Sequence, residues 1–302
     1  MSSTNNSSNT EGTTSLWSAL PTLLGVALRR SPGLGGGATI PTIEVERTLT
    51  VDAAWLAAYR GCIGAVDDGA MPPCAPQVLA VGLHLAILRD PRFPLPALGM
   101  VHVENVIEEQ APIRAGATVQ LTAAVTGHRP HDKGVLFDIV TEAHVDGSVP
   151  WRSVMTALVR TADARATTDT SKSSKKATVD DSAPPLPLLS SSSIRVPADM
   201  GRRYARVAGD ANPIHLTALT AKAFGFPRAI AHGMWTLGRS LSEIHVDQVS
   251  APRRIAVRFI RPVLLPSTIV VEARRAAAGP LLLSVTPEKP GAPHILGRVE
   301  PL

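Results

Sequence analysis

The sequence predicts an α+β protein of two tandem modules, each an antiparallel sheet wrapped around a central helix. Three observations predict this class. In each half of the chain a helical stretch precedes a largely apolar stretch, and several segments that alternate like strands follow. A linker rich in Ser, Thr and Pro separates the halves at residues 161–193. Short sequence matches at constant spacings relate one half to the other.

Length and composition suit this architecture. The 302 residues are enough for two domains of ordinary size, and 44% hydrophobic with 18% charged residues is typical of globular proteins. Aromatic residues make up only 4%, which argues against base-stacking surfaces for single-stranded nucleic acid. Cys62 and Cys74 are too few for a disulfide framework, and no Cys/His cluster has zinc spacing. We therefore expect a cytoplasmic protein without a metal.

The net charge of +5 is unevenly distributed along the chain. Residues 194–302 hold 15 Lys+Arg against 7 Asp+Glu, an excess of +8, and the rest is slightly acidic. There are no Lys/Arg runs and no recognised nucleic-acid motif, so we expect no nucleic-acid partner. A polyphosphate ligand, an acidic carrier protein or a solvated basic surface would each explain the excess.

Residues 1–39 precede the first module. The first 15 are polar and of low complexity, which predicts disorder, and Leu16–Leu28 is mostly apolar. Only Glu11 is charged before this run, which lacks the positive charge of a secretory signal and is too short to cross a bilayer. We expect a helix that packs on the protein and no membrane span, with contact to a membrane surface as the alternative.

The first module is predicted at residues 40–160. Ile43–Val51 alternates like a half-buried strand, and Asp52 is a suitable N-cap for a helix at Ala53–Tyr59. Gln77–Leu88 is apolar on nearly all sides, which predicts a buried helix. Four predicted strands follow, at Met100–Ile107, Thr118–Thr126, Val135–Val145 and Trp151–Arg160.

The second module, at residues 194–302, repeats this order. We expect a short strand at Ile194–Val196 and helices at Met200–Ala208 and Gly233–Ile244. Strands are expected at Ile255–Ile260, Ile269–Arg275, Leu281–Thr286 and His294–Val299. Two matches make the repeat concrete: residues 75–82 align with 231–238 at an offset of 156, and residues 112–123 align with 262–273 at an offset of 150.

The chemistry concentrates after the helix at Met200–Ala208. Asp210, Asn212 and His215 place an acid, an amide and an imidazole within one short stretch, where Asn212 is a suitable cap for a helix expected from His215 through Lys222. A capped turn without catalytic meaning is the plainest interpretation. However, Gly233 begins the next helix, and N–H groups at a helix start stabilise negative charge on an oxygen. An acid–base pair beside a carbonyl held in this way can add water reversibly across a conjugated double bond.

A family resemblance rests on these residues. The run Tyr204-x3-Ala208-Gly209-Asp210-x-Asn212-Pro213-Ile214-His215-x5-Ala221, with Gly225-Phe226 and His232-Gly233-Met234, resembles the hydratase 2 motif of the MaoC-like dehydratases. The likeness spans residues 194–298, and the first half matches only in organisation. It implies a double hotdog fold and an (R)-specific enoyl-CoA hydratase or 3-hydroxyacyl-thioester dehydratase of fatty acid metabolism. The substrate would be a thioester of coenzyme A or of an acyl carrier protein, without any further cofactor.

The resemblance also assigns roles to residues. Asp210 and His215 would be the catalytic pair that holds the water, and Asn212 would support that pair. The Gly233 N–H would bind the thioester carbonyl. Ala208 departs from the Ser or Thr of many members, but it touches none of these roles.

The first module lacks the same residues. With Tyr59 as the counterpart of Tyr204, Ala65 stands in place of Asp210, and Gln77 stands in place of Gly233. The interval from this tyrosine to the buried helix ends at Ala75 in the first module and at Ala231 in the second, so it is clearly shorter in the first. We therefore expect a catalytically inactive first module, in which the missing segment leaves room for a long acyl tail.

Other residues have plainer interpretations. We expect His84 to be a hydrogen-bonded core residue and His232 to be structural, whereas Arg258 and Arg261 would contact coenzyme A phosphates or lie on the surface. A hotdog thioesterase and a non-catalytic acyl-thioester-binding partner are the alternative functions, and a homodimer of such chains is the assembly considered.

Overall fold

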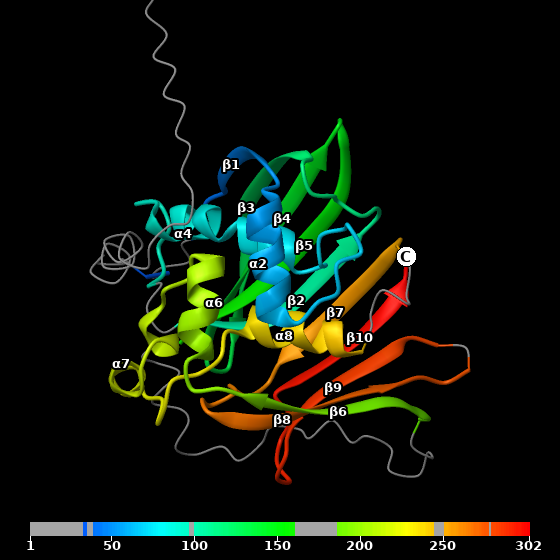
Figure 1. The fold of residues 1–302 in the computed structure, drawn as a ribbon. Coiled ribbons are helices and arrows are strands. Elements are labelled where there is room, and N and C mark those ends of the chain that lie inside the picture. The colour runs from blue at the N-terminus through cyan, green and yellow to red at the C-terminus, as the bar shows by residue number, and fades with distance from the viewer. Residues whose placement is uncertain (1–32, 35–38, 97–99, 161–185, 245–250, 278) are drawn as a thin grey trace, which may run out of the picture.

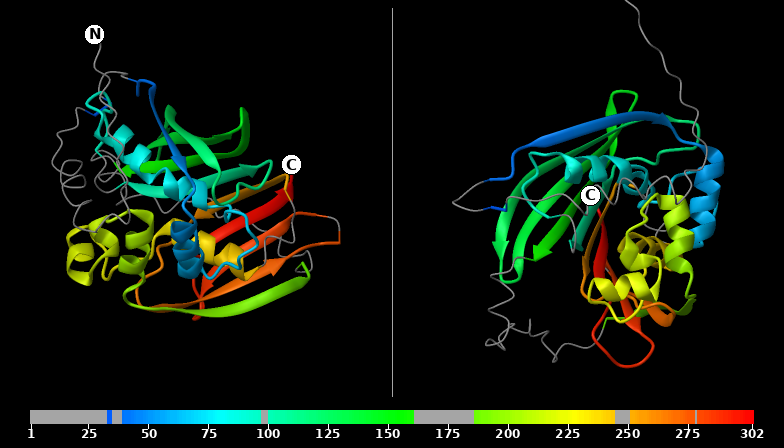
Figure 2. Two further views of the ribbon diagram at one scale, coloured as in Figure 1. Left: turned by 45° about the horizontal axis from the view of Figure 1, so that its top comes forward. Right: turned by 90° about the vertical axis from the view of Figure 1, so that its left-hand side faces the viewer.

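A computed structural model describes residues 33–34, 39–96, 100–160, 186–244, 251–277 and 279–302. Within these ranges ten strands form one continuous sheet, in the order β1-β3-β4-β5-β2-β7-β10-β9-β8-β6. The first five strands in this order come from one half of the chain and the last five from the other (Figure 1). Figure 2 shows the helices gathered on one side of the curved sheet. The predicted α+β class with two modules is confirmed.

The elements follow the predicted order closely. The strands are β1 Ile43–Thr50, β2 Val101–Glu109, β3 Thr118–His131, β4 Gly134–Val145, β5 Ser148–Arg160, β6 Leu188–Val196, β7 Arg253–Phe259, β8 Ser267–Arg274, β9 Leu281–Pro287 and β10 Ile295–Pro301. The helices are α2 Ala53–Ile63, α3 Ala75–Leu79, α4 Val81–Arg89, α6 Met200–Ala208, α7 Ala218–Ala223 and α8 Gly233–Glu243, with a 3₁₀ turn η3 Pro213–His215.

The two half-sheets join through an antiparallel pairing of β2 with β7. In this pairing Val106 lies opposite Ala256, which is 150 positions further along the chain. This spacing equals the predicted repeat offset for the strands, so Val106 pairs with its own counterpart. A residue can pair with its counterpart only on an axis of two-fold symmetry. The two modules therefore pack as a dimer does, within one chain.

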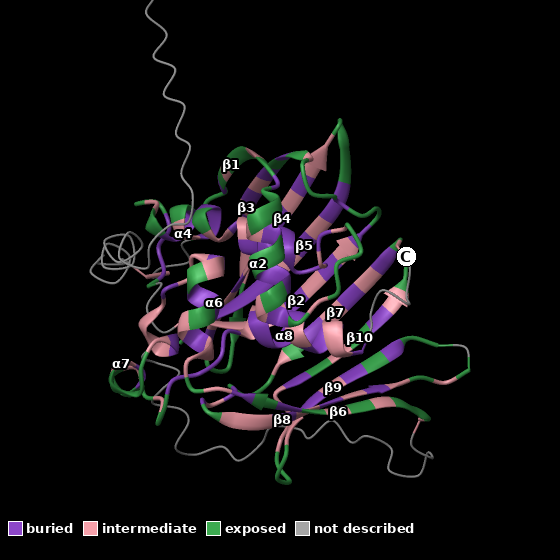
Figure 3. Cartoon of the chain, in the orientation of Figure 1, coloured by how far each residue is buried: buried purple, intermediate pink, exposed green. Residues whose placement is uncertain are grey.

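The core lies between the sheet and the helices. Buried residues alternate along the strands on the side that faces the helices (Figure 3), as in β8, where Ile269, Val271 and Ala273 are buried. Asp52 caps α2 as predicted, since its side chain accepts a hydrogen bond from Trp55 N. The α2 helix packs against α6 of the other module. Both modules thus contribute to one hydrophobic core.

The prediction of one buried helix at Gln77–Leu88 was wrong in two respects. The segment forms two helices, α3 and α4, which meet at Ala80. In addition, α4 exposes Gly82 to solvent and leaves Val81 only partly buried. A small residue such as Gly82 resembles a core residue in composition, but it presents no side chain that needs burial.

Two further boundaries differ from the prediction. Strand β6 begins at Leu188, ahead of the predicted start at Ile194, and pairs with β8 through a run of four serines that shows no alternation in sequence. The helix expected from His215 through Lys222 is instead η3 followed by α7. A capping box at Thr217, with Thr220, starts α7 afresh and separates the two.

Some expectations concern residues outside the described ranges. The helix predicted at Leu16–Leu28 lies there, and so does most of the linker. Among the helices that are described, none has the length and hydropathy needed to cross a bilayer.

Candidate active site

Asp210 lies immediately after α6, whose C-cap Gly209 has a φ of 71°. The Asp210 carboxylate accepts a hydrogen bond from Asn212 N at 3.1 Å, and the Asn212 side chain accepts one from Ile214 N at 3.3 Å. Two successive side-chain-to-backbone bonds therefore shape the segment that leads into η3. Asn212 caps this turn, as predicted from its sequence position.

His215 ends the same turn and is buried. Its Nδ1 lies 2.8 Å from the carbonyl oxygen of Ile230, which can only accept, so Nδ1 donates. Ile230 N in turn donates to Ile214 O at 3.1 Å, so the two segments bind each other. Burial, and then the neighbouring His232, lower the pKa of His215 to about 3. His215 is thus neutral near pH 7, and its Nε2 is the ring nitrogen that carries a lone pair.

Gly233 is the first residue of α8, with His232 as the N-cap. The first N–H groups of a helix have no acceptor within the helix and carry partial positive charge. A Cβ placed on Gly233 would lie 3.1 and 3.3 Å from two ring atoms of Phe259, which is closer than an ordinary contact. Glycine is therefore favoured at this position by its crowded surroundings.

His232 connects these parts of the site. Its Nε2 donates to the backbone oxygen of Asp210 at 3.0 Å, and its ring stacks on the His215 ring with centroids 3.6 Å apart. One side-chain nitrogen or oxygen atom of each of Asp210, His215 and His232 lies within 4.8 Å of the other two. The structure thus brings the predicted acid and imidazole together at the start of α8.

The same three side chains carry atoms that could in principle bind a metal ion. The two imidazole rings are stacked with their planes only 25° apart, so their in-plane lone pairs lie in nearly parallel planes. His215 Nδ1 is already bonded to Ile230 O, and His232 Nε2 to Asp210 O. This arrangement does not suit tetrahedral zinc coordination.

Two residues of α6 hold the His215 turn, and sequence reasoning missed both. A Cβ on Gly201 would overlap the backbone oxygen of His215, so only glycine fits there. Arg202 donates to Leu216 O at 2.9 Å. Glycine inside a helix lowers helix stability relative to alanine. The presence of Gly201 in α6 is therefore the one signal in the sequence for a close packing contact.

Three other predicted positions are placed as follows. His84 is buried and lies 2.8 Å from Thr141 Oγ1, as expected for a core histidine, although Asp210 is near enough to act on its pKa. The exposed Arg258 pairs with Glu104 of the other module at 3.5 Å. Arg261 accepts at its backbone oxygen from His294 Nδ1 at 3.2 Å. The contact of Arg258 and Arg261 with coenzyme A phosphates stays a prediction.

The first module differs from the second at the catalytic segment. Both α2 and α6 end on a glycine with positive φ, Gly64 and Gly209, which makes Ala65 the counterpart of Asp210. The next feature that both modules share is a backbone hydrogen bond. Met71 N donates to Ile113 O in the first module, and Ala231 N donates to Val263 O in the second. Met71 follows Gly64 closely, whereas Ala231 comes much later after Gly209. Asp210 therefore opens a longer connection, and His215 lies within it.

This bond corrects one predicted equivalence. Met71, and not Ala75, is the counterpart of Ala231, because their acceptors Ile113 and Val263 keep the offset of 150 that relates the strands. Pro73, and not Gln77, then stands in the position of Gly233. Proline has no N–H, so this position provides no backbone donor for an oxyanion.

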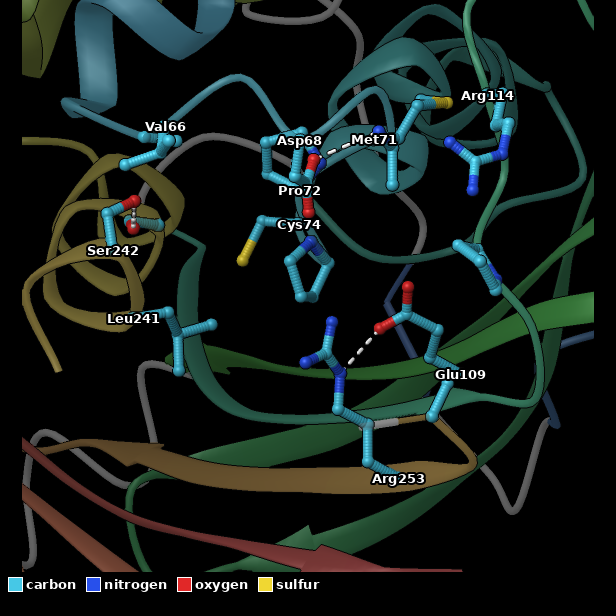
Figure 4. Close-up of a pocket in the computed structure, with 16 residues that line it drawn as sticks. Val66, Asp68, Met71, Pro72, Cys74, Glu109, Arg114, Leu241, Ser242 and Arg253 are labelled. Carbon is cyan, nitrogen blue, oxygen red and sulfur yellow. Dashed lines mark hydrogen bonds and ion pairs between the residues drawn. The ribbon is translucent and has the colours of Figure 1, made fainter. Parts of the chain in front are cut away.

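A cavity of about 340 Å³ lies between this region of the first module and α8 of the second. Its lining includes Ala65, Pro73 and Cys74, and Figure 4 shows the ion pair of Glu109 with Arg253 directed into it. Glu109 is the counterpart of Phe259 at the strand offset, and its carboxylate lies 2.7 Å from Arg253 Nε. A buried ion pair thus replaces the aromatic ring that covers Gly233 in the second module.

Comparisons with known proteins agree with this architecture. A family model described as MaoC like domain matches residues 168–279. The 3-hydroxyacyl-thioester dehydratase X of Mycobacterium tuberculosis is 34% identical over 261 residues, which cover 86% of this chain and 89% of that protein. The crystal structure of HtdX of Mycobacterium tuberculosis matches with a TM-score of 0.72 and 31% identity, covering 87% of this chain and all of that one.

A second solved structure names the fold. A conserved hypothetical protein of Mycobacterium tuberculosis, described as having a double hotdog fold, matches with a TM-score of 0.54 and 14% identity over 89% of this chain and 97% of that one. The fold and site together define a double hotdog protein with an acid and an imidazole beside a helix start. The chain belongs to the MaoC-like dehydratase family, and it is a hydro-lyase.

Proposed function

We propose that this protein catalyses the reversible (R)-specific hydration of trans-2-enoyl thioesters and the dehydration of (R)-3-hydroxyacyl thioesters in fatty acid metabolism. The observation that carries the proposal is the cluster of Asp210, His215 and His232, in which one side-chain N or O atom of each residue lies within 4.8 Å of the others beside the first turn of α8. The substrate is a thioester of coenzyme A or of an acyl carrier protein, and no further cofactor takes part.

In the hydration direction, Asp210 and the neutral His215 hold one water through their acceptor atoms. The water oxygen bonds to C3 of the enoyl group and loses one proton to the pair, and the pair returns one proton to C2. Negative charge that develops on the thioester oxygen is held by the Gly233 N–H. Asn212 maintains the turn that carries Asp210. Dehydration follows the same steps in reverse.

The inactive first module would accommodate the acyl tail. Its connection from Gly64 to Met71 is much shorter than the equivalent connection from Gly209 to Ala231, so it leaves out a segment that the second module has. We expect activity on long-chain thioesters as well as on four-carbon ones. Strict preference for four-carbon substrates would exclude this role.

Replacing Asp210 by Ala tests the function directly. Loss of the acid–base group should lower kcat by about 10²–10⁴-fold, with the fold intact. The measurement is steady-state hydration of trans-2-enoyl esters from C4 to C16, as coenzyme A and as carrier-protein thioesters. Substantial hydratase activity in Asp210→Ala would overturn the proposal.

The same assay distinguishes the alternatives. A thioesterase would release free thiol from acyl-CoA, and this release is measured in parallel. A non-catalytic binding partner would hold the thioester without converting it. The proposal predicts hydration without thiol release.

A further inference from the structure

The imidazole of His232 contacts both proposed catalytic residues in different ways. It donates from Nε2 to the Asp210 backbone oxygen at 3.0 Å, and it lies face to face with the His215 ring at 3.6 Å. The next residue is Gly233, whose N–H is the proposed oxyanion donor. His232 is buried, with 3% of its surface exposed, whereas the Asp210 side chain is 35% exposed. One buried ring thus connects the three working parts of the site.

The hydrogen bond to Asp210 fixes the backbone that carries the acid. Asp210 follows a left-handed cap residue and precedes the turn, so it belongs to neither α6 nor η3. Its carboxylate is bonded to Asn212 N, within the same segment. The bond from His232 instead joins Asp210 to the start of α8. It therefore sets the position of the acid relative to the oxyanion donor.

The His232 ring holds the imidazole of His215 in place, and aromatic residues of the first module support the His232 ring in turn. Tyr204 of α6 packs on His232 with centroids 4.9 Å apart, and Tyr59 of α2 packs on Tyr204 at 6.4 Å. Trp55 then stacks on Tyr59 at 5.5 Å and donates from Nε1 to Val207 O. An aromatic column therefore runs from the first module to the proposed catalytic imidazole, and His232 is its last member before His215.

We propose that His232 is a positioning residue, which uses its Nε2–H to hold the Asp210 backbone and its ring face to hold His215, so that both meet one water beside Gly233. This inference rests on the proposed hydratase function. His232 is not assigned a proton transfer, because its Nε2–H is bonded to Asp210 O and its Nδ1 is buried.

The groups around His215 determine the sign of the expected pH effect. Burial lowers the pKa of His215 most, His232 lowers it further because two adjacent imidazolium ions would repel, and Asp210 raises it. Tyr204 faces His232 from α6, and His84 of α4 lies within the electrostatic reach of Asp210. Removing His232 takes away a group that disfavours protonated His215. The pKa of His215 therefore rises in such a variant.

Two replacements separate the two contacts. His232→Gln keeps an N–H donor for Asp210 O but loses the ring, and His232→Phe keeps a ring over His215 but loses the donor. His131→Gln is the control, because His131 is an exposed histidine of the first module, on β3. Kinetic constants on trans-2-enoyl-CoA and the pH profile of kcat/KM are measured for all three, with Asp210→Ala as the inactive reference.

We expect kcat to fall on the order of 10-fold to 100-fold in each His232 variant, with KM within threefold, because small displacements of catalytic groups have effects of this size. The acid limb of the kcat/KM profile should move to higher pH in both variants, and His131→Gln should leave all values unchanged. If one of the two His232 variants does not fold, the kinetics of the other still test the positioning role. A loss of rate without a shift of the acid limb, or unchanged kinetics, would overturn the positioning role. Activity in Asp210→Ala would instead overturn the proposed function.

Discussion

The proposed catalytic turn depends on residues that do no chemistry. His215 owes its place to a bond from Nδ1 to Ile230 O, to the His232 ring and to the absence of a side chain at Gly201. Each of these contacts joins segments from different elements. The position of one imidazole is thus set by α6, by the start of α8 and by the segment at Ile230.

Gly201→Ala tests this dependence at the residue scale. The added methyl group would overlap the His215 backbone oxygen, so the turn or α6 must move. We expect a loss of stability of about 1–3 kcal/mol and a loss of hydratase activity, measured by urea unfolding and by steady-state kinetics.

A second helix glycine provides the control for that variant. Gly61 of α2 has open space where its Cβ would lie, so Gly61→Ala should raise stability by up to about 1 kcal/mol through helix propensity alone. Equal behaviour of the two variants would contradict the close contact at Gly201.

At the scale of elements, the joint between β2 and β7 contains a buried ion pair. Glu109 and Arg253 lie opposite each other in the pairing, with 3% and 6% of their surfaces exposed. Their bond of 2.7 Å compensates part of the cost of removing two charges from water. The two side chains also line the cavity between the modules.

Breaking this pair should be costly, and replacing it should not. Arg253→Met leaves a buried carboxylate without this partner and is expected to destabilise the protein by about 3–5 kcal/mol. The double variant Glu109→Met with Arg253→Met should recover most of that loss in urea unfolding. An exposed pair at the start of α6, Arg203 with Asp199, is the control, and its removal should leave the unfolding midpoint almost unchanged. Additive effects of the two Met replacements would contradict this account.

At the scale of the whole molecule, the repeated architecture holds one candidate active site within the described residues. The strands keep the pseudo-two-fold arrangement, because one sheet must remain continuous across the β2–β7 joint for both modules to bury their helices. The connection from Gly209 to Ala231 is not part of the sheet. It can therefore be much longer than the equivalent connection after α2 without disturbing the strand pairing. The proposed chemistry thus resides where the repeat diverges.

Buried histidines make the stability of the whole molecule dependent on pH. Burial lowers the pKa of His84 to about 4 and that of His215 to about 3. In the unfolded chain both take up protons near their ordinary pKa of about 6.5. Between about pH 6.5 and pH 4 the unfolded state therefore binds more protons, and stability falls as the pH falls, by about 1.4 kcal/mol per pH unit for each histidine at full effect.

Urea unfolding at pH 7, 6 and 5 measures this slope. His84→Gln, which retains a donor for Thr141, should reduce the slope by the share of one histidine. Replacement of the exposed His131 by Gln is the control. A slope that His84→Gln leaves unchanged would contradict the contribution of this buried residue.

Most of the fold could be predicted from the sequence because hydrophobic periodicity is a local property of the chain. The alternation of Ile269, Val271 and Ala273 and the cap at Asp52 each depend on neighbours along the sequence, and both agree with the structure. The serine run of β6 could not be predicted, since its pairing with β8 comes from a distant strand. The break between α3 and α4 also lacks a local signal.

The sequence by itself determined the two modules, the grouping of Asp210 with His215 in one turn, and the glycine that opens α8, because these follow from patterns and motifs within short stretches of the chain. Only the tertiary structure decided that His232 lies on His215, that Gly201 must have no side chain, and that Pro73 stands in the place of Gly233. These facts concern contacts between segments that are distant in sequence or only loosely aligned. Their physical basis is the close packing of separate elements, which no local pattern records.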